Sequence, residues 1–353
     1  MDEVLQYVWD SAEMRMHGDG VAAPDIRALK TSIKSWDEWL TAWAELAEEN
    51  EATADEALSA GASITAGEDY WQAAMCWHYG QFLWFHRPEE RREAQERKVM
   101  MYRKSSDLLS PPAERVDIAF EGTQIPAYLR LPDLQGPSPC VILIGGLEST
   151  KEESYLFENA CLRRGLATMA FDGPGQGEYF FQRPLVGDFE RYTSAVADYL
   201  EQRPEIDRAK LAIVGRSLGG YYAVRSCVFD QRYKACVAFG ALFDLRHFDD
   251  LHPLVQSGFR YITGILDEDE AVATLKRLVD LEEVAPRLET PLYLLHGALD
   301  RLIPVSQAQR LASLATRSEK KVVIEPNGKH CAHNIYHRVR RPMIDWVVAR
   351  LSN

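Results

Sequence analysis

From residue 115 onward, short apolar runs alternate with stretches of helical periodicity, and this alternation limits the possible folds more than any other feature. Segments such as 191–204 and 306–318 have helical spacing and lie between the runs. Strands that alternate with helices of this length predict a parallel sheet covered on both faces. The apolar runs, read as strands, are 140–146, 166–173, 210–217, 234–241, 291–297 and 321–326.

A change of pattern at SPPAER, residues 110–115, marks the expected domain boundary. The proline pair ends a helical region and starts an extended one. The next residues, 115–131, alternate around a four-residue turn and predict a β-hairpin. A mostly helical insertion is expected at about 247–288. We therefore expect an N-terminal helical domain over 1–110 and an α/β domain over 111–353.

The first 110 residues have helix-length apolar patterns and no strand-like alternation. Apolar residues in 32–50 recur at steps of three and four, and further helices are expected over 68–85 and 87–109. Aromatic residues at helical spacing indicate a buried core, and the alternative is that some of them line an apolar pocket. Seven of the eight tryptophans lie in this region, namely Trp9, Trp36, Trp39, Trp43, Trp71, Trp77 and Trp84.

Composition excludes several classes of partner. The net charge is −13, and an acidic chain repels phosphate backbones, so nucleic acid is not an expected partner. There is no run of 18 apolar residues and no basic-then-apolar start, so we expect no membrane span, no secretion signal and a cytoplasmic protein. The six cysteines are scattered without a C-x-x-C pair, which predicts buried thiols and no metal site.

A serine between glycines is the strongest chemical signal. Gly215-Arg216-Ser217-Leu218-Gly219-Gly220 follows an apolar strand and precedes a helix-like segment. A nucleophile elbow needs this context, because the serine occupies a sharp strand-to-helix turn where glycines let the backbone pack closely. A serine hydroxyl attacks well only when a base removes its proton. Ser217 is therefore the candidate nucleophile, and an acid and a histidine are expected after it in the chain.

The expected acid is Asp300, which comes a few residues after a late strand. From that position a carboxylate can reach the ring of a histidine on the next loop. Asp244 and Asp249 are alternatives, but both follow the strand next to the elbow strand, which is early for this position.

The expected base lies on the loop after the last strand, which offers three histidines. His330 comes soonest after the turn at 326–328, where a loop histidine can reach back to the serine. His333 and His337 are expected on the helix that begins there. We predict His330 as the base and keep His333 as the alternative.

Two N–H donors are needed for the oxyanion that develops when a serine attacks a carbonyl. One is expected from the backbone of Leu218, and the other from Gly146 and Leu147, on the loop after the first parallel strand. A further glycine cluster, 172–178, lacks the lysine of a phosphate-binding loop, and Pro174 has no N–H to offer. This cluster is expected to shape one rim of the pocket, and we expect no cofactor.

The glycine and histidine motifs together resemble one family, that of 2,6-dihydroxypseudooxynicotine hydrolase, which cleaves carbon–carbon bonds and has fungal relatives that shorten polyketides. The resemblance implies an α/β-hydrolase core with an N-terminal helical cap, often as a homodimer. It implies the triad Ser217, Asp300 and His330, and supports Gly146 and Leu147 as the oxyanion loop. The motifs are GGLESTKEES (145–154), FDGPGQGE (171–178), GRSLGG (215–220), LLHGALD (294–300) and GKHCAHN (328–334).

The resemblance also implies the reaction. We expect hydrolysis of an acyl–carbon bond in an aryl ketone or β-diketone-like small molecule, through an acyl-enzyme on Ser217. One alternative is a carboxylesterase with the same triad, acting on a small aromatic or apolar ester. The other is a catalytically inactive binding protein on this fold.

Overall fold

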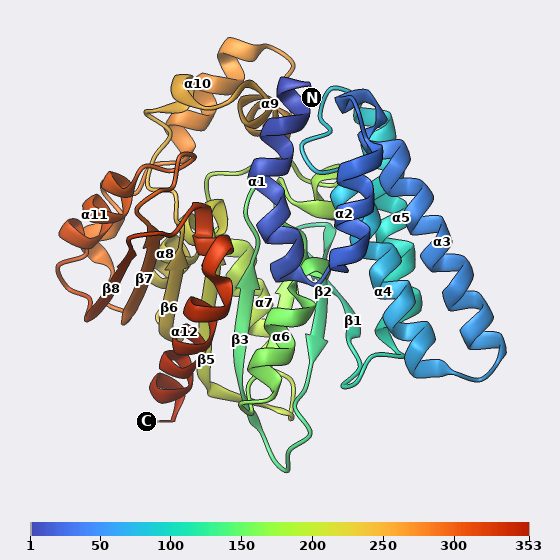
Figure 1. Ribbon diagram of the computed structural model, residues 1–353. Helices are drawn as coiled ribbons and strands as arrows, with labels where there is room; N and C mark the ends of the chain where they lie inside the picture. The colour runs from blue at the N-terminus through green and yellow to red at the C-terminus, as the bar shows by residue number, and fades with distance from the viewer. Residues whose placement is uncertain (1, 353) are drawn as a thin grey trace. The chain divides into compact units, whose positions relative to one another are not determined.

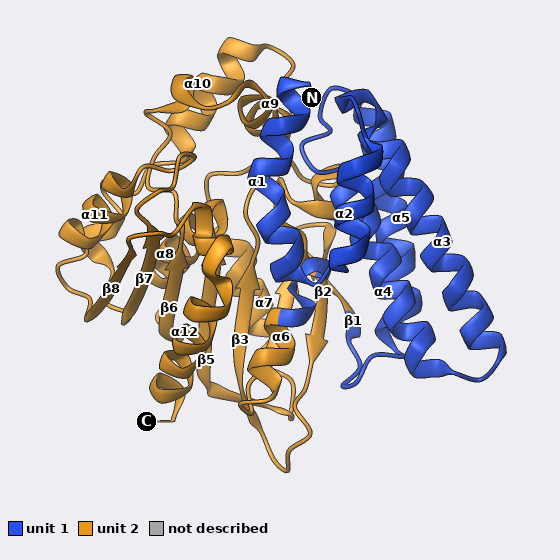
Figure 2. Cartoon of the chain, in the orientation of Figure 1, with its two compact units in different colours: residues 1–115, 152–156 blue, residues 116–151, 157–353 orange. Residues whose placement is uncertain are grey.

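The computed structural model describes residues 2–352, which form two compact units (Figure 2). The first unit comprises residues 1–115 together with 152–156, and the second comprises 116–151 and 157–353. The sequence pattern gave no sign that the short segment 152–156 groups with the N-terminal helices. No helix within the described residues is both long and apolar enough to cross a membrane.

The first unit consists of helices. The three helices expected from the sequence are present, with ends shifted by several residues, and two more precede them. A proline at the start of α5 fits the first helical turn, where its missing N–H would have no partner within the helix. The helices are α1 (Glu3–Asp19), α2 (Ala23–Ser32), α3 (Trp39–Ser59), α4 (Ser63–Gly80) and α5 (Pro88–Ser106).

Tryptophan side chains form much of the core of this unit. All seven tryptophans of the region are 8% exposed or less, which supports the core interpretation for each of them. Trp39 is central, because its ring centroid lies 4.8 Å from that of Trp9, 5.5 Å from that of Trp36 and 5.7 Å from that of Trp43. Such rings contribute large apolar areas and favourable edge contacts.

Buried charges hold segment 152–156 within the first unit. Glu153 pairs with Arg15 of α1, and its carboxylate lies 2.9 Å from His78 Nε2. The neighbouring Glu152 lies 3.1 Å from Lys98 Nζ of α5, and both of these side chains are fully buried. Burial, followed by the charges of Lys98 and Arg15, holds the pKa of His78 well below its ordinary value. His78 is therefore neutral at pH 7, and the arginine is the cation that offsets the charge of Glu153.

The second unit is built on an eight-stranded sheet with the order β1-β2-β4-β3-β5-β6-β7-β8 (Figure 1). β2 runs antiparallel to β4, and every pair from β4 to β8 is parallel. The mostly parallel sheet and the expected strands are confirmed. The strands are β1 (Glu114–Phe120), β2 (Thr123–Arg130), β3 (Ser138–Ile144), β4 (Ala167–Phe171), β5 (Ile206–Arg216), β6 (Tyr233–Phe239), β7 (Leu292–Gly297) and β8 (Lys320–Glu325).

Helices cover both faces of this sheet. Apolar residues of α6 and α12 pack together against β3, β5, β6 and β7 in one buried cluster, while α7 and α8 lie on the other face (Figure 1). Two further helices, α9 and α10, occupy the stretch between β6 and β7. The bounds are α6 (Tyr155–Leu162), α7 (Glu190–Glu201), α8 (Leu218–Phe229), α9 (Pro253–Thr263), α10 (Glu268–Leu278), α11 (Val305–Leu314) and α12 (Tyr336–Leu351).

The strand register aligns the carboxyl ends of the central strands. Ile144 of β3 lies opposite Gly215 of β5, and Arg216 of β5 lies opposite Phe239 of β6. β7 and β8 end together, with Gly297 opposite Glu325. The loops that leave these strands therefore start from one edge of the sheet, which is where ligands bind in open α/β sheets.

The buried ion pair in the helical unit gives the first testable prediction. Arg15→Met removes the buried cation beside Glu153 and should lower the free energy of unfolding by about 3 kcal/mol, because a buried carboxylate then loses the charge that offsets it. Arg92→Met is the matched control, since Arg92 pairs with Glu96 on the solvent face of α5 and exposed pairs contribute about 0–1 kcal/mol. Urea unfolding followed by circular dichroism measures both changes. Equal effects in the two variants would contradict the prediction.

Candidate active site

Ser217 lies at the sharp turn between β5 and α8. Its backbone has φ 56° and ψ −122°, a left-handed conformation that costs a residue with a side chain about 1–3 kcal/mol. The turn is held by a hydrogen bond of 3.0 Å from the Ser217 N–H to the Phe239 carbonyl of β6. The hydroxyl is thereby fixed at the carboxyl edge of the sheet.

The glycines around Ser217 are required by close backbone contacts. A Cβ atom on Gly215 would collide with the carbonyl of Gly219, and one on Gly219 would collide with the carbonyls of Ile144 and Gly145. Larger residues at either position would push α8 away from β5 and from the loop after β3. The sequence interpretation of this motif as a strand–turn–helix is confirmed.

Asp300 follows β7 and is fixed by its own loop. Its Oδ1 accepts hydrogen bonds of 2.9 Å from the N–H groups of both Leu302 and Ile303. Its Oδ2 lies 2.8 Å from His330 Nδ1. Because backbone N–H groups hold Oδ1, the orientation of Oδ2 toward the imidazole does not depend on His330 alone.

His330 follows β8 and links the carboxylate to the serine. Its Nδ1 faces Asp300, and its Nε2 lies 3.1 Å from Ser217 Oγ. The two contacts use opposite sides of the ring, so a proton can pass from the hydroxyl to Nε2 while Nδ1–H stays bonded to the carboxylate. The structure thus brings together the three side chains that the sequence singled out.

The carboxylate and the imidazole shift each other's pKa. Burial alone would raise the pKa of Asp300, but the charge and hydrogen bond of His330 and the Ile303 N–H outweigh burial and hold that pKa below its ordinary value. Burial alone would lower the pKa of His330, but the charges and hydrogen bonds of Asp300 and of the neighbouring Cys331 thiol outweigh burial and raise the pKa to about 10. The carboxylate is therefore placed to stabilise the imidazolium that forms when Nε2 accepts a proton.

The alternative residues have other partners. Asp244 accepts a hydrogen bond from the Arg246 N–H, and the exposed Asp249 pairs with Lys276. The expectation that His333 lies on the helix is wrong, because it is buried in the 3₁₀ turn that precedes α12, whereas His337 lies on α12 as expected. The hydrogen bond to Ser217 Oγ is made by His330 and not by one of these four side chains.

The loop after β3 lies against the serine. A Cβ atom on Gly146 would be 2.9 Å from Ser217 Cβ and 3.0 Å from the Arg216 carbonyl, so this position has no room for a side chain. Within residues 2–352, the N–H groups of Gly146, Leu147 and Leu218 donate no hydrogen bond to another protein atom. All three predicted donors are therefore available at the same end of the sheet.

Sequence reasoning missed the contact between this loop and the glycine cluster after β4. Gln176 Nε2 donates hydrogen bonds to the carbonyl oxygens of Gly145, at 2.6 Å, and Gly146, at 3.5 Å. The cluster was expected to shape one rim of a pocket, and the only sequence signal for the contact is a lone amide within a glycine-rich loop.

A mostly parallel sheet with a serine at a strand-to-helix turn, followed in the chain by an aspartate and a histidine that meet it, defines the α/β-hydrolase class. A family model described as esterase FrsA-like matches residues 33–256. The chain therefore belongs to the FrsA-like esterase family. The prolyl oligopeptidase family model also matches residues 187–353.

Individual relatives agree with this assignment. The chain is 40% identical, over 93% of its length and 89% of the relative, to 2,6-dihydropseudooxynicotine hydrolase of Paenarthrobacter nicotinovorans. A crystal structure of 2,6-dihydroxy-pseudo-oxynicotine hydrolase matches with a TM-score of 0.90, 39% identity and coverage of 96% of this chain and 95% of that one. The 20-hydroxy-prefusarin hydrolase of Gibberella moniliformis is 36% identical over 59% of this chain and 52% of its own. The resemblance inferred from the motifs is confirmed, and this protein is a hydrolase.

Removing the carboxylate beside His330 tests the electrostatic coupling. In Asp300→Asn the pKa of His330 should fall by about two pH units, because burial then acts without the opposing carboxylate charge. NMR titration of the imidazole measures the change. Asp249→Asn, which neutralises an exposed carboxylate on another loop, is the control and should leave the titration unchanged. An unchanged His330 titration in Asp300→Asn would show that the two groups are not coupled.

Proposed function

We propose that this protein hydrolyses an acyl–carbon bond in an aryl ketone or β-diketone-like small molecule, with Ser217 as nucleophile, His330 as base and Asp300 as the group that orients the base. The observation that carries the proposal is the continuous hydrogen-bond chain from Ser217 Oγ through His330 to Asp300, at 3.1 and 2.8 Å. The relative named as an oxynicotine hydrolase, which covers nearly the whole chain, supports the substrate class.

The first step is attack on the carbonyl. His330 Nε2 takes the proton of Ser217 as the Oγ–carbon bond forms, and the imidazolium is stabilised by Asp300. The carbonyl oxygen becomes an oxyanion that accepts hydrogen bonds from the N–H groups of Leu218 and the Gly146–Leu147 loop. Each such donor is worth about 2.7–4 kcal/mol in the transition state of a serine hydrolase.

The second step breaks the carbon–carbon bond. The electron pair of that bond leaves with the carbon fragment, which takes the proton from the His330 imidazolium. A dihydroxylated ring or the central carbon of a β-diketone accepts the pair because the resulting carbanion is delocalised, whereas a simple alkyl group does not. Water then attacks the acyl-enzyme with His330 again as base, and the acyl group leaves as a carboxylic acid while Ser217 regains its proton.

A carboxylesterase is the second candidate, and the description of the matching family model as esterase FrsA-like favours it. The two reactions share the nucleophile, the base and the oxyanion donors, and differ in the leaving group. An alkoxide or phenolate leaves without carbanion stabilisation, so an esterase does not require a delocalised ring in its substrate.

We also propose that the enzyme works as a homodimer in the cytoplasm, as the resemblance to the oxynicotine hydrolase family implies. Light scattering on the purified protein measures the dimer directly.

A fluorophosphonate probe tests the nucleophile. We expect the wild-type protein to be labelled and Ser217→Ala to be unlabelled, with hydrolysis reduced at least roughly 10⁴-fold, since no other hydroxyl lies in the turn. Ser313→Ala removes an exposed hydroxyl on α11 and should be labelled like the wild type. Labelling that survives in Ser217→Ala, or a wild-type protein that is never labelled, would contradict the assignment and favour a binding protein.

Substrate comparison tests the bond that is cleaved. Rates on acylated dihydroxyarenes should exceed those on the matching monohydroxy ketones by roughly 100-fold, because the second hydroxyl further stabilises the departing carbanion. kcat/KM values for both series and for p-nitrophenyl esters, measured on one preparation, make the comparison. Short esters that turn over far faster than every ketone would support the esterase instead.

A further inference from the structure

Gln176 is a buried amide that the proposed mechanism does not yet use. It lies on the loop after β4, and its side chain is 2% exposed. Its Oε1 accepts a hydrogen bond of 3.1 Å from the Gly173 N–H of its own loop, which fixes the amide plane. Its Nε2 then points at the carbonyl oxygens of Gly145 and Gly146, at 2.6 and 3.5 Å.

Those two carbonyls belong to the peptide units that carry the proposed oxyanion donors. The Gly145 carbonyl shares a peptide plane with the Gly146 N–H, and the Gly146 carbonyl shares one with the Leu147 N–H. In a planar trans peptide the C=O and N–H bonds point in opposite directions. An amide that holds both carbonyls therefore directs both N–H groups to the side away from Gln176.

We infer that Gln176 is a positioning residue that orients the N–H groups of Gly146 and Leu147 for the oxyanion, an inference that rests on the proposed function. The Gly146 carbonyl also accepts a hydrogen bond of 3.3 Å from the Ser149 N–H of its own loop, whereas the Gly145 carbonyl is held by Gln176 at 2.6 Å. Glycine has the largest backbone freedom of all residues, so the peptide between Gly145 and Gly146 gains most from that partner. Oxyanion donors accelerate a reaction only when they are already aimed at the developing charge.

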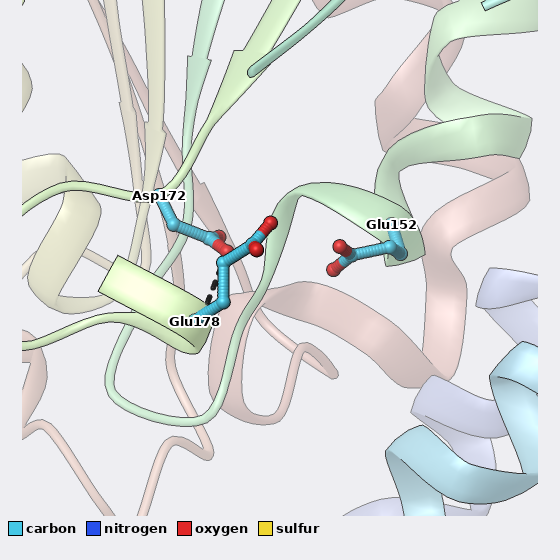
Figure 3. Close-up of side chains that lie close together, drawn as sticks. All are labelled: Glu152, Asp172 and Glu178. Atoms are coloured by element: carbon cyan, nitrogen blue, oxygen red, sulfur yellow. Dashed lines mark hydrogen bonds between the residues drawn. The ribbon is translucent and has the colours of Figure 1, made fainter. Parts of the chain in front are cut away.

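The same two loops are tied at a second point. Asp172 Oδ1 accepts a hydrogen bond of 2.9 Å from the Lys151 N–H, and Asp172 Oδ2 lies 2.9 Å from Lys151 Nζ. The Glu178 N–H donates to Asp172 Oδ2 at 3.3 Å, which is the dashed contact in Figure 3, and the Glu178 carboxylate lies 2.6 Å from Lys151 Nζ. The ion pairs anchor the far end of the 145–151 loop, and Gln176 orients its glycine end.

Gln176 could instead be a purely structural amide, which satisfies buried carbonyls and does not stabilise the transition state more than the ground state. The orienting role and the structural role predict different effects on kcat and on stability. Loss of an orienting group reduces kcat and leaves KM nearly unchanged, because the oxyanion exists only after attack. Loss of a structural group lowers stability, while the folded fraction keeps its kcat.

Gln176→Met is the decisive variant, because it keeps the length of the side chain and removes both hydrogen-bonding groups. We expect kcat to fall about 100-fold, as when an oxyanion donor is lost, with KM within about threefold of wild type. The rate constant for fluorophosphonate labelling should fall in parallel, since the phosphoryl oxygen uses the same donors. Gln182→Met is the matched control, since Gln182 lies on the same segment but is exposed and contacts the Gln124 carbonyl at 3.4 Å.

Gln176→Glu gives an independent signature if the methionine variant does not fold. An ionised carboxylate repels the two carbonyl oxygens, whereas a protonated carboxyl can donate to one of them, so the labelling rate relative to wild type should rise as the pH is lowered. Burial raises the pKa of such a carboxyl and brings the change into an accessible range. A purely structural group would give a constant ratio.

The outcomes separate this inference from the proposed function. If the wild type is not labelled, the proposed function fails. If the wild type is labelled and folded Gln176→Met keeps kcat and labelling within threefold, only the inference on Gln176 is overturned. A ratio for Gln176→Glu that does not change with pH overturns it as well.

Discussion

The backbone of Ser217 is the constraint on which the site depends. A residue with a side chain occupies a left-handed conformation there, held by a hydrogen bond to the Phe239 carbonyl and by glycine contacts to the loop after β3. The sheet can hold this strained conformation because β5 is an interior strand of eight. Relaxing the turn would disturb the packing of β3 and β6, which lie on either side of it. The stability of the sheet thus holds the hydroxyl in place.

Parallel strands explain how residues far apart in sequence meet at that hydroxyl. β5, β7 and β8 all end at one edge of the sheet, so the loops after them deliver Ser217, Asp300 and His330 to one place. The backbone of its own loop holds one oxygen of the Asp300 carboxylate, and the other oxygen faces the imidazole.

The fold could be predicted from sequence where one local signal determined the structure. Apolar runs of strand length located the strands of the sheet, and glycines on both sides of a serine located the elbow. Two features gave no such signal. The partners of Gln176 depend on how two separate loops fold, and segment 152–156 groups with the helices because Glu152 and Glu153 bond to side chains more than 50 residues away. Local pattern does not encode polar contacts of that kind.

Buried charge has two different consequences in the second unit. The Asp300 carboxylate raises the proton affinity of His330, which takes the proton of Ser217 and later returns it in the proposed reaction. The pair of Lys151 and Asp172 exchanges nothing, and a buried ion pair of this kind adds little net stability over apolar packing. The pair joins Lys151, at the end of the glycine-rich loop, to the loop after β4. A site that needs backbone N–H groups aimed at a charge not yet formed requires rigidity, and apolar contacts alone do not orient a peptide plane.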